Sequence, residues 1–330
     1  MTQRLIYVLF FAIGLFASFA LTYTSSPSSH LFQNEPLSLS SQEQDWLLQQ
    51  ELSIHTIKKQ APDYNAIKKI YKKIKSISSS ITKLSTQAEA KENKTKNRYH
   101  CFLPFDENRT CREIPGFYLS ASDVLTPTQQ YIMAQGPLEN TAPDFWYALI
   151  ERNCPLIVTA VMAIEKGNDK CYGYWENHAF PIETHGWVVT PTADSPIIAE
   201  EESHRIVKRS FICLHKATQE SKTITQLHYE NWPDNGIPNF DLFVRLLDEV
   251  DEMQIATTTP IAVHCSAGIG RSGTFVAAHS LRKALQQESN HHQDHLINIP
   301  KAIIALRLQR PYLIANAEQL QTVYQVLAKD

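Results

Sequence analysis

Residues 260–274 read PIAVHCSAGIGRSGT. The apolar run at 260–264 predicts a strand, the glycines after it predict a loop, and the segment from Gly270 onward predicts a helix. Gly268 and Gly270 let the backbone wrap closely around a ligand, so that successive N–H groups point inward. The positive N-terminal end of the following helix strengthens the same field. We therefore expect an anion-binding loop at the end of a strand.

The residue types of this loop fit phosphate chemistry. The planar guanidinium of Arg271 matches two phosphate oxygens. In this positive field the pKa of the Cys265 thiol should fall well below that of a free thiol, giving a thiolate nucleophile that needs no separate base. We predict that His264 holds the loop by hydrogen bonds rather than acting as a base, and that the Ser272 hydroxyl bonds to the sulfur. A buried structural cysteine beside a glycine turn is the alternative.

The whole chain has the composition of a globular protein. Its 330 residues are 43% apolar and 20% charged, with 10 Gly and 17 Pro, and the length fits one or two domains. The net charge of −3 and the pI near 6.5 argue against nucleic acid as a partner. Charge is uneven along the chain, because residues 1–96 carry 12 Lys and Arg against 7 Asp and Glu, whereas residues 97–330 carry 19 against 27. This asymmetry indicates two regions.

An uncharged apolar run occupies residues 5–21, directly after Arg4. Together with the small-residue site at 18–20, it predicts a secretory signal peptide over residues 1–21. An uncleaved membrane anchor is the main alternative, because the run has about the minimum length of a spanning helix, and a buried core helix is a third interpretation. We expect the chain to be exported, either periplasmic or secreted, or else anchored in a membrane by this segment.

Three further regions follow this segment. Residues 22–40 are rich in Ser and Pro and predict a linker, and residues 41–97 predict helices that form the N-terminal part of a catalytic region. Within them, residues 63–84 combine an isoleucine stripe of helical period with several lysines. This Lys-rich helix could contact an anionic membrane surface, although a solvated face is the simpler interpretation. Residues 98–330 form the predicted catalytic domain.

Short β-like runs alternate with helical ones in residues 98–330. The predicted strands are 156–162, 186–190, 210–214, 223–228 and 260–264. The predicted helices are 144–152, 241–254, 270–287, 300–307 and 317–329. This interleaving indicates an α/β or α+β domain.

The cysteines and histidines give no pattern of a metal site. Six cysteines lie at positions 101, 111, 154, 171, 213 and 265, without C-x-x-C or finger spacing, so we predict no structural zinc. Cys101 and Cys111 could form a short-loop disulfide or remain free thiols. The histidines at 291, 292 and 295 lie in a polar stretch that reads as a solvated loop rather than a metal site.

The cysteine loop resembles, without a gap, the signature of the tyrosine-specific protein tyrosine phosphatases. Four other segments resemble further motifs of that family, in the expected order. They are KNRY at 96–99, YIMAQGPLENTAPDFW at 131–146, EKGNDKCYGYW at 165–175 and WPDNGIP at 232–238. The resemblance runs from about residue 41 to the C-terminus. It implies a twisted mixed β-sheet flanked by helices, an α/β (α+β) fold with an N-terminal helical extension.

The resemblance also implies hydrolysis of phosphotyrosine in protein substrates through a cysteinyl-phosphate intermediate. Cys265 would be the nucleophile, and Arg271 would bind the phosphate without any metal or cofactor. The backbone of the loop would complete the phosphate site, through Ser266, Ala267, Gly268, Ile269 and Gly270. Asp234 would be the general acid that protonates the leaving tyrosyl oxygen.

The other family motifs imply supporting roles. Trp232 would restrict the mobile loop that carries the acid, residues 232–238, which we call the acid loop. Tyr99 would line a slot deep enough to select phosphotyrosine over phosphoserine. Glu165 would pair with Arg271, and Lys170 would lie near the acid loop. Arg307 would support the phosphate loop from behind. Gln319 would position the water for the second step.

Three positions depart from the family pattern. Ala315 stands where a glutamine normally directs the attacking water, which suggests a slow second step. Cys101 stands in place of an acidic residue that grips the substrate backbone, and Tyr312 replaces a glycine that opens a neighbouring pocket. A slow-turnover or inactive phosphotyrosine-binding module is therefore one alternative. A dual-specificity or phosphoinositide phosphatase is another, although those enzymes usually carry lysines in the cysteine loop or have a shallower pocket.

Overall fold

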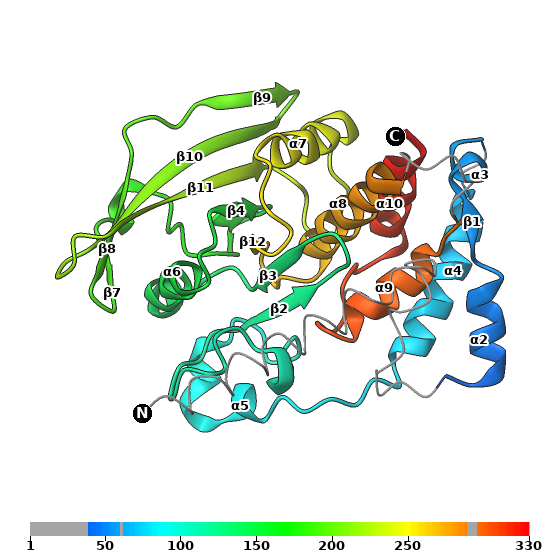
Figure 1. Cartoon of the computed structure of the whole chain (residues 1–330), viewed down its shortest axis with the longest axis horizontal. Helices are drawn as coiled ribbons and strands as arrows, with labels where there is room; N and C mark the ends of the chain where they lie inside the picture. The colour runs from blue at the N-terminus through cyan, green and yellow to red at the C-terminus, as the bar shows by residue number, and fades with distance from the viewer. Residues whose placement is uncertain (1–38, 60–61, 289–295, 330) are drawn as a thin grey trace, which may run out of the picture. The chain divides into compact units, whose positions relative to one another are not determined.

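A mixed sheet of nine strands forms the centre of the chain in the computed structural model, which describes residues 39–59, 62–288 and 296–329 (Figure 1). Its strands are β2 (Ala121–Leu125), β3 (Gln130–Ala134), β4 (Leu156–Thr159), β7 (Ile182–Thr184), β8 (Trp187–Pro191), β9 (Ile197–Glu201), β10 (His204–His215), β11 (Ser221–Glu230) and β12 (Ile261–His264). Two small pairs lie outside it, β1 (Leu52–Ser53) with β13 (Leu296–Ile297) and β5 (Ile164–Glu165) with β6 (Asn168–Asp169).

The order of the strands explains where the cysteine loop lies. It is β2-β3-β12-β4-β11-β10-β8-β7, with β9 added to β10. The pairs β3–β12, β12–β4 and β4–β11 are parallel, and the outer pairs are antiparallel. All four residues of β12 are buried, as expected for a parallel strand covered on both faces. Its carboxyl end, the usual ligand-binding edge of such sheets, leads directly into the cysteine loop. The predicted twisted mixed sheet is thus confirmed.

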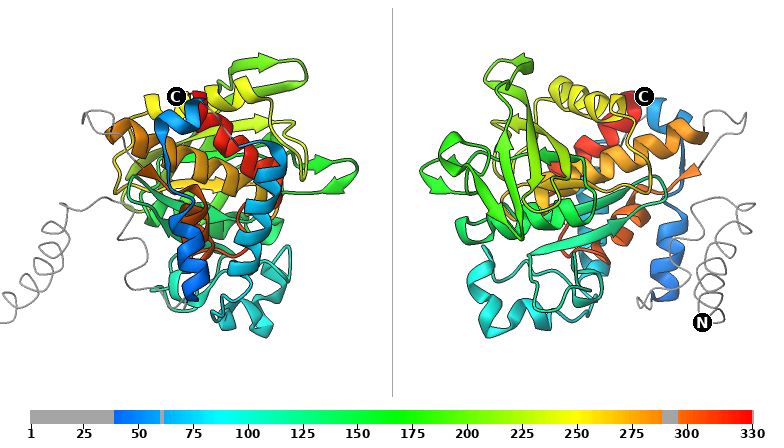
Figure 2. Two further views of the ribbon diagram at one scale, coloured as in Figure 1. Left: turned by 90° about the vertical axis from the view of Figure 1, so that its right-hand side faces the viewer. Right: turned by 60° about the vertical axis from the view of Figure 1, so that its left-hand side comes forward.

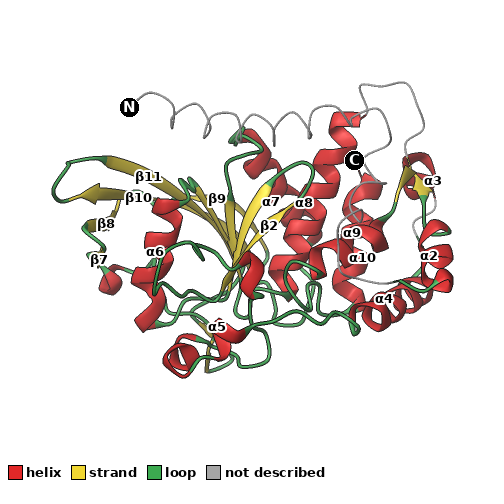
Figure 3. Cartoon of the chain, turned by 60° about the horizontal axis from the view of Figure 1, so that its bottom comes forward, coloured by secondary structure: helices red, strands yellow, loops and turns green. Residues whose placement is uncertain are grey.

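Helices cover both faces of the sheet. The longer ones are α2 (Ser41–Leu48), α3 (Ile54–Lys59), α4 (Tyr64–Ser78), α6 (Ala142–Glu151), α7 (Phe240–Glu252), α8 (Gly270–Glu288), α9 (Ile299–Arg307) and α10 (Ala317–Lys329). Shorter turns are α5 (Thr86–Glu89), η1 (Lys91–Lys96), η2 (Asp106–Asn108), η3 (Glu139–Thr141) and η4 (Asn177–Ala179). Figure 3 shows α6 separated by the strands from α7 and α8.

Alternate side chains of the central strands face these two helical layers. Ile132 of β3 and Ala262 of β12 lie in one buried cluster with Trp146 of α6. Tyr131, the neighbour of Ile132, points the other way, and its hydroxyl lies 2.7 Å from Nδ1 of His279 in α8. This alternation is the period of two that a strand imposes on its side chains.

The N-terminal helices pack against the C-terminal ones. Helices α3 and α4 contact α10, and α4 also contacts α9, so the blue and red ends of the chain lie together in both views of Figure 2. The isoleucines of α4 at 67, 74 and 77 are buried in this contact, whereas its lysines at 68, 69, 72 and 75 are exposed. The helix is amphipathic as predicted, but its apolar face is already covered by the chain itself.

The Lys-rich helix is shorter than the predicted 63–84. It is capped by Asp63, whose carboxylate accepts a hydrogen bond from Ala66 N at 2.8 Å, and it ends at Ser78. The hydroxyls of Ser78, Ser79 and Ser80 each donate to a carbonyl three or four residues earlier. Such side-chain bonds compete with the helical backbone ladder, which explains the early end.

Other boundaries also differ from the predictions. The predicted strand 156–162 ends at Thr159, and the predicted strand 210–214 is the C-terminal part of the much longer β10. Four strands of the nine-stranded sheet were not predicted at all, namely β2, β3, β7 and β9. Helix α10 has the predicted bounds.

Two predictions lie partly or wholly outside the described residues. The signal or anchor segment 5–21 and most of the linker 22–40 belong to residues 1–38, and the histidines at 291, 292 and 295 also fall outside. In the described ranges, every helix is too short or too polar to cross a membrane. Nor do those ranges contain a group of three or more His, Cys, Asp or Glu side chains able to hold a metal ion.

Candidate active site

The cysteine loop is shaped by close contact with strand β3. Gly268 has φ +70°, and a Cβ atom at this position would lie 2.0 Å from the carbonyl oxygen of Ala134. Any other residue would therefore meet both backbone strain and a steric clash. Arg310, which is fully buried, donates from Nε to Gly268 O at 2.8 Å and from Nη2 to Ala267 O at 3.2 Å. These contacts hold the carbonyls of Ala267 and Gly268 toward Arg310, while the amides of Ile269 and Ser272 face the Cys265 sulfur.

Cys265 lies in this loop at the bottom of a pocket and is 3% exposed. Burial by itself raises the pKa of its thiol, but the charge of Arg271 and hydrogen bonds from Ser272 and from the Ile269 amide offset it, so the pKa is lowered. The Ser272 hydroxyl is itself buried and has no oxygen or nitrogen partner in the part of the chain that the structure describes. This hydroxyl lies close enough to the Cys265 sulfur to contribute to the lowered pKa of the thiol.

The guanidinium of Arg271 is held by two other loops. Its Nη1 and Nη2 donate to the two carboxylate oxygens of Glu165 at 2.6 and 3.3 Å, and Nη1 also donates to the Trp232 carbonyl at 2.8 Å. Arg271 is 2% exposed, so this charge is both buried and paired. The Trp232 side chain is also buried, and its indole N–H donates to Gly236 O at 3.1 Å across the acid loop. The predicted Glu165–Arg271 pair is thus present.

Asp234 lies at the mouth of the pocket between two cations. Its Oδ2 accepts from Lys170 Nζ at 2.8 Å, and its Oδ1 lies 3.5 Å from Arg271 Nη2. Burial raises the pKa of this carboxyl, but the hydrogen bond from Lys170 and the charges of Arg271 and Lys170 outweigh it, so the pKa is lowered overall. These two cations therefore hold Asp234 as a carboxylate.

An aromatic wall faces these charged groups. The Tyr99 hydroxyl lies 2.8 Å from Ser266 Oγ, which in turn donates to Lys170 O at 2.8 Å. Phe102 packs beside Tyr99 and against Tyr312, with ring centroids 5.9 and 5.6 Å apart. The pocket of about 290 Å³ is lined by Tyr99, Phe102, Lys170, Asp234, Asn235, Cys265, Ser266, Ala267, Ile269, Gly270, Arg271, Ala315 and Gln319.

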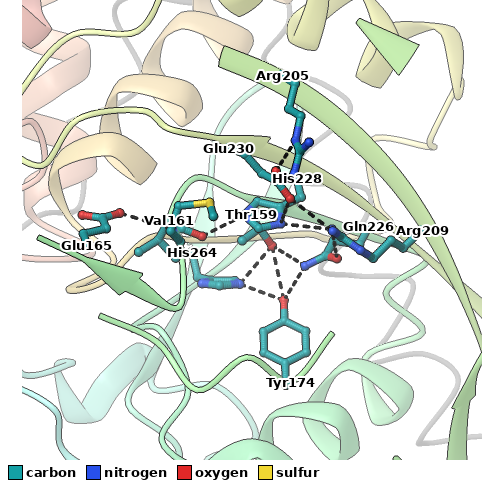
Figure 4. Close-up of polar contacts among 11 residues, drawn as sticks. Thr159, Val161, Glu165, Tyr174, Arg205, Arg209, Gln226, His228, Glu230 and His264 are labelled. Carbon is teal, nitrogen blue, oxygen red and sulfur yellow. Dashed lines mark hydrogen bonds and ion pairs between the residues drawn. The ribbon is translucent and has the colours of Figure 1, made fainter. Parts of the chain in front are cut away.

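A buried polar network lies behind the nucleophile (Figure 4). His264 donates from Nδ1 to Cys265 O at 3.2 Å, and its Nε2 accepts from the Tyr174 hydroxyl at 2.8 Å. Burial lowers the pKa of His264 to about 4, so this side chain is neutral at neutral pH. Gln226 then donates to Tyr174 and to Thr159, which extends the network along β11. This geometry agrees with the prediction that His264 supports the loop.

The network continues to the start of the acid loop. Glu230, the last residue of β11, is buried and pairs with Arg205 at 2.5 Å and with Arg209 at 3.2 Å. Arg209 also donates to Nδ1 of His228 at 3.0 Å, and His228 donates from Nε2 to Val161 O at 2.8 Å (Figure 4). The strand that leads into the acid loop is thereby connected to the segment that leads to Glu165. Sequence reasoning missed this cluster, because its members are spread over three strands.

Arg307 does not occupy the predicted place behind the cysteine loop. Its guanidinium donates to the carbonyls of Leu313 and Ile314, at 2.9 and 3.0 Å. It therefore supports the loop formed by residues 312–316, and the role predicted for it is filled by Arg310. Arg307 is the last residue of α9 and Arg310 follows three residues later, so spacing alone does not distinguish them.

The loop 312–316, which we call the water loop, closes the pocket beside Gln319. The Gln319 side chain accepts from Ala315 N at 2.8 Å, and its Nε2 lies 3.4 Å from Gly236 O in the acid loop. Tyr71 of α4 donates its hydroxyl to Ala315 O at 2.6 Å. No sequence pattern indicates this contact from the N-terminal helix.

The six cysteines are all free thiols, and their environments differ. Burial raises the pKa of Cys111, Cys154 and Cys213 to about 12, and it raises that of Cys171 as well. Cys101 is exposed, and no disulfide joins it to Cys111. Only Cys265 combines burial with a lowered pKa.

A cysteine, an arginine and an aspartate thus surround one pocket at the carboxyl end of a parallel strand. The family model described as protein-tyrosine phosphatase matches residues 93–329. The chain therefore belongs to the protein-tyrosine phosphatase family, whose members are hydrolases.

Individual relatives agree with this assignment. Receptor-type tyrosine-protein phosphatase V of Rattus norvegicus is 32% identical over 243 residues, which cover 71% of this chain and 14% of that protein. Tyrosine-protein phosphatase non-receptor type 20 of Mus musculus is 32% identical over 242 residues, covering 72% of this chain and 54% of that protein. The chain thus spans well under two thirds of either relative.

A solved structure of PTPN18 has the same fold, from work described as "Structural basis of PTPN18 fingerprint on distinct HER2 tyrosine phosphorylation sites". The two chains superpose with a TM-score of 0.71 at 26% identity. The superposition covers 80% of this chain and 94% of that one.

Proposed function

We propose that this protein hydrolyses phosphotyrosine in protein substrates through a cysteinyl-phosphate intermediate. The observation that carries the proposal is that Cys265, with its lowered pKa, shares one pocket with the paired guanidinium of Arg271 and with Asp234. Membership of the protein-tyrosine phosphatase family supports it, as does the likeness to the PTPN18 structure, which is described in terms of tyrosine phosphorylation sites.

In the first step, the Cys265 thiolate attacks phosphorus and the bond from phosphorus to the tyrosyl oxygen breaks. Arg271 and the inward N–H groups of the loop balance the charge on the phosphate oxygens, so that the chemistry needs no metal. A protonated Asp234 gives its proton to the leaving oxygen, which matters because a phenolate with a pKa near 10 is a poor leaving group. The dianionic substrate would itself favour this protonation, because it cancels the positive field of Arg271 and Lys170.

In the second step, water attacks the phosphorus of the cysteinyl-phosphate and the sulfur leaves as a thiolate. The Asp234 carboxylate takes the proton of the water and is ready for the next cycle. The buried Ser272 hydroxyl, which has no other partner among the described residues, would stabilise the departing sulfur. The water must be positioned without the usual glutamine, since Ala315 offers no hydrogen-bonding side chain. Gln319, which lines the pocket, or Asn316 would take this task, although the Gln319 oxygen already accepts from Ala315 N.

Selectivity for phosphotyrosine would come from the depth of the pocket. The Tyr99 ring forms one wall, and a phosphoserine would not reach Cys265 past it. The exposed Cys101 replaces the expected acidic residue, and the exposed ring of Tyr312 packs on Phe102. The change at Cys101 suggests a weaker hold on the peptide backbone. The change at Tyr312 suggests exclusion of doubly phosphorylated peptides.

One specific observation favours an alternative function. The protein would then be a slow enzyme that acts as a phosphotyrosine-binding module. Ala315 lines the pocket where the water-directing glutamine is expected. This alternative keeps the first step and slows the second.

The deciding experiment measures phosphate release by the full chain, without added metal, from phosphotyrosyl and phosphoseryl forms of one peptide and from phosphoinositides. Turnover of phosphotyrosine alone, abolished by Cys265→Ser and reduced about 10²- to 10⁴-fold by Asp234→Ala, supports the proposal. Tight binding of the phosphotyrosyl peptide with no phosphate released would support the binding module. Preference for phosphoinositides would contradict the substrate class.

From the sequence of residues 5–21 alone, we also propose export by a signal peptide, with retention as a membrane anchor as the alternative. Fractionation of cells that express the full chain, followed by determination of the mature N-terminus, tests both. A processed chain outside the cytosol fits a cleaved signal, and an intact chain in the cytosol contradicts both.

A further inference from the structure

Asn316, at the end of the water loop, has a different partner at each end of its side-chain amide. Its Oδ1 accepts from Gln319 N at 2.8 Å, which makes Asn316 the N-cap of α10. Its Nδ2 donates to the carbonyl of Asn235 at 2.7 Å. Asn235 directly follows Asp234 in the acid loop, so one side chain joins a rigid helix end to the residue next to the acid.

The cap fixes the direction of the donor. Because Oδ1 is held by the first turn of α10, the side chain does not rotate freely, and Nδ2 points at the acid loop in advance. Asn235 has φ +55°, a left-handed conformation that non-glycine residues adopt at a cost. The hydrogen bond from Asn316 to its carbonyl offsets part of that cost.

A second contact lies beside the first. Gln319, one turn into α10, places its Nε2 3.4 Å from the carbonyl of Gly236, the residue after Asn235. On the other side of the acid loop, Arg271 donates to the Trp232 carbonyl. The loop is therefore held before Asp234 by Arg271 and after it by the N-terminal end of α10.

We propose that Asn316 is a positioning residue that holds the acid loop closed over the pocket through the Asn235 carbonyl. The proposal rests on the proposed function, in which Asp234 must reach the leaving oxygen. Asn316 does not touch the reacting atoms, and it acts through the backbone beside Asp234.

Asn316→Asp separates the two ends of the side chain. An aspartate keeps the helix cap, but its second oxygen faces the Asn235 carbonyl with no proton to share. Asn316→Ser also keeps a cap and is too short to reach the acid loop. The matched control is Asn298→Asp, because Asn298 caps α9 in the same way and donates its amide to Leu47 O, in another part of the chain.

The first readout needs no activity. Amide hydrogen exchange of the full-length protein should be about three- to tenfold faster over residues 231–238 in both Asn316 variants, with α10 unchanged. Asn298→Asp should leave the exchange of residues 231–238 as in the unmodified chain. Equal exchange of the acid loop in the Asn316 variants and the unmodified chain would overturn the proposal, whether or not phosphotyrosine is the substrate.

The second readout is kcat/KM for aryl phosphates that differ in the pKa of the phenol. The Asn316 variants should lose about three- to tenfold with phenyl phosphate and much less with a nitrophenyl phosphate, because a good leaving group needs less help from an acid. In the Asp234→Ala background, Asn316→Asp should cause no further loss. An equal loss for both substrates, or a loss that adds to that of Asp234→Ala, would mean that Asn316 does not act through the acid.

A failure of the proposed function can be distinguished from a failure of the proposal for Asn316. If the unmodified chain released no phosphate from any of these esters, the mechanism would fail, whereas the exchange experiment would still decide whether Asn316 holds the loop.

Discussion

The cysteine loop and the water loop line the same pocket and are held in different ways. The cysteine loop needs a left-handed conformation only at a glycine, Gly268. The water loop has that conformation at Tyr312 and at Ile314, with φ of +64° and +62°. For a β-branched residue such as Ile314 this is a true outlier, with a cost of about 1–3 kcal/mol. The first loop has a sequence that suits its shape, and the second has its shape imposed from outside.

The contacts that hold the water loop come from a neighbouring helix end and from two distant parts of the chain. Arg307 and Tyr71 donate to its carbonyls, and Ile314 N donates to Ile269 O at 3.1 Å. In the proposed mechanism, the loop that binds phosphate and forms the intermediate has a sequence suited to its conformation, whereas the loop beside the attacking water depends on a contact from the N-terminal helix. The comparison predicts that the phosphate site depends mainly on residues of the cysteine loop itself, whereas the conformation of the water loop depends on several dispersed residues.

The largest effects are expected in the cysteine loop. Cys265→Ser should reduce turnover of a phosphotyrosyl peptide to background, a loss of about 10⁴-fold or more, because the hydroxyl is not ionised at neutral pH. Arg271→Lys should cost about 10²- to 10³-fold, because an ammonium lacks the planar fork that fits both phosphate and Glu165. Steady-state kinetics measures both. A Cys265→Ser variant that kept more than a few per cent of the activity would contradict the role given to the cysteine loop in this comparison.

Ala315→Gln should act on the second step alone. The unmodified chain should give a pre-steady-state burst of phenol followed by a slow phase, because the cysteinyl-phosphate accumulates. Introducing the glutamine should raise kcat about tenfold and shrink the burst. The value of kcat/KM should be unchanged, since it reports only the steps up to the first irreversible one. Rapid-mixing experiments measure the burst. Its absence in the unmodified chain at every pH would show that Ala315 does not limit the rate.

Tyr71→Phe should have a smaller effect, on the water loop alone. It removes the hydroxyl that bonds Ala315 O and should cost about 1 kcal/mol of unfolding free energy. The burst rate should stay unchanged while the slow phase changes. Tyr64→Phe in the same helix is the control, because its hydroxyl bonds the side chain of Glu318 rather than the loop. A change in burst rate for Tyr71→Phe would mean that the two loops are not independent.

The smallest expected effect is a shift in pH dependence. Lys170 donates to Asp234 and helps to lower the pKa of its carboxyl. The acid is active when protonated, so activity falls as the pH rises through this pKa. Lys170→Met should raise the pKa and move the alkaline limb of kcat/KM to higher pH, with the acid limb set by Cys265 unchanged. Movement of the alkaline limb to lower pH would contradict the assignment of Asp234.

Most of the cysteine loop could be predicted because the residues that carry its chemistry are contiguous in the chain. Strand, glycines, arginine and helix follow one another within fifteen positions, and each local preference agrees with the final structure. The mixed sheet also follows from the alternation of apolar runs. Strands β2, β3, β7 and β9 were missed, because short strands with polar or turn residues give little period-two signal.

The contacts that were missed are those between distant segments. Arg310 and Arg307 differ only in which loop they reach, and that depends on how α9 meets the sheet. The bonds from Tyr71 to Ala315 and from Asn316 to Asn235 join residues 244 and 81 positions apart. Residue type and spacing carry no information on such pairs, which require the packed structure.

The contrast among the thiols has a practical consequence. Four of the cysteines are buried with a raised pKa, whereas Cys265 has a lowered one and lies beside a guanidinium. A negatively charged alkylating reagent such as iodoacetate is drawn to that guanidinium, beside the thiol whose pKa is lowered. Once the exposed Cys101 is replaced, the protein can thus receive a single chemical label at its active site with its four buried cysteines in place, and loss of that label in the presence of a ligand counts occupied pockets directly.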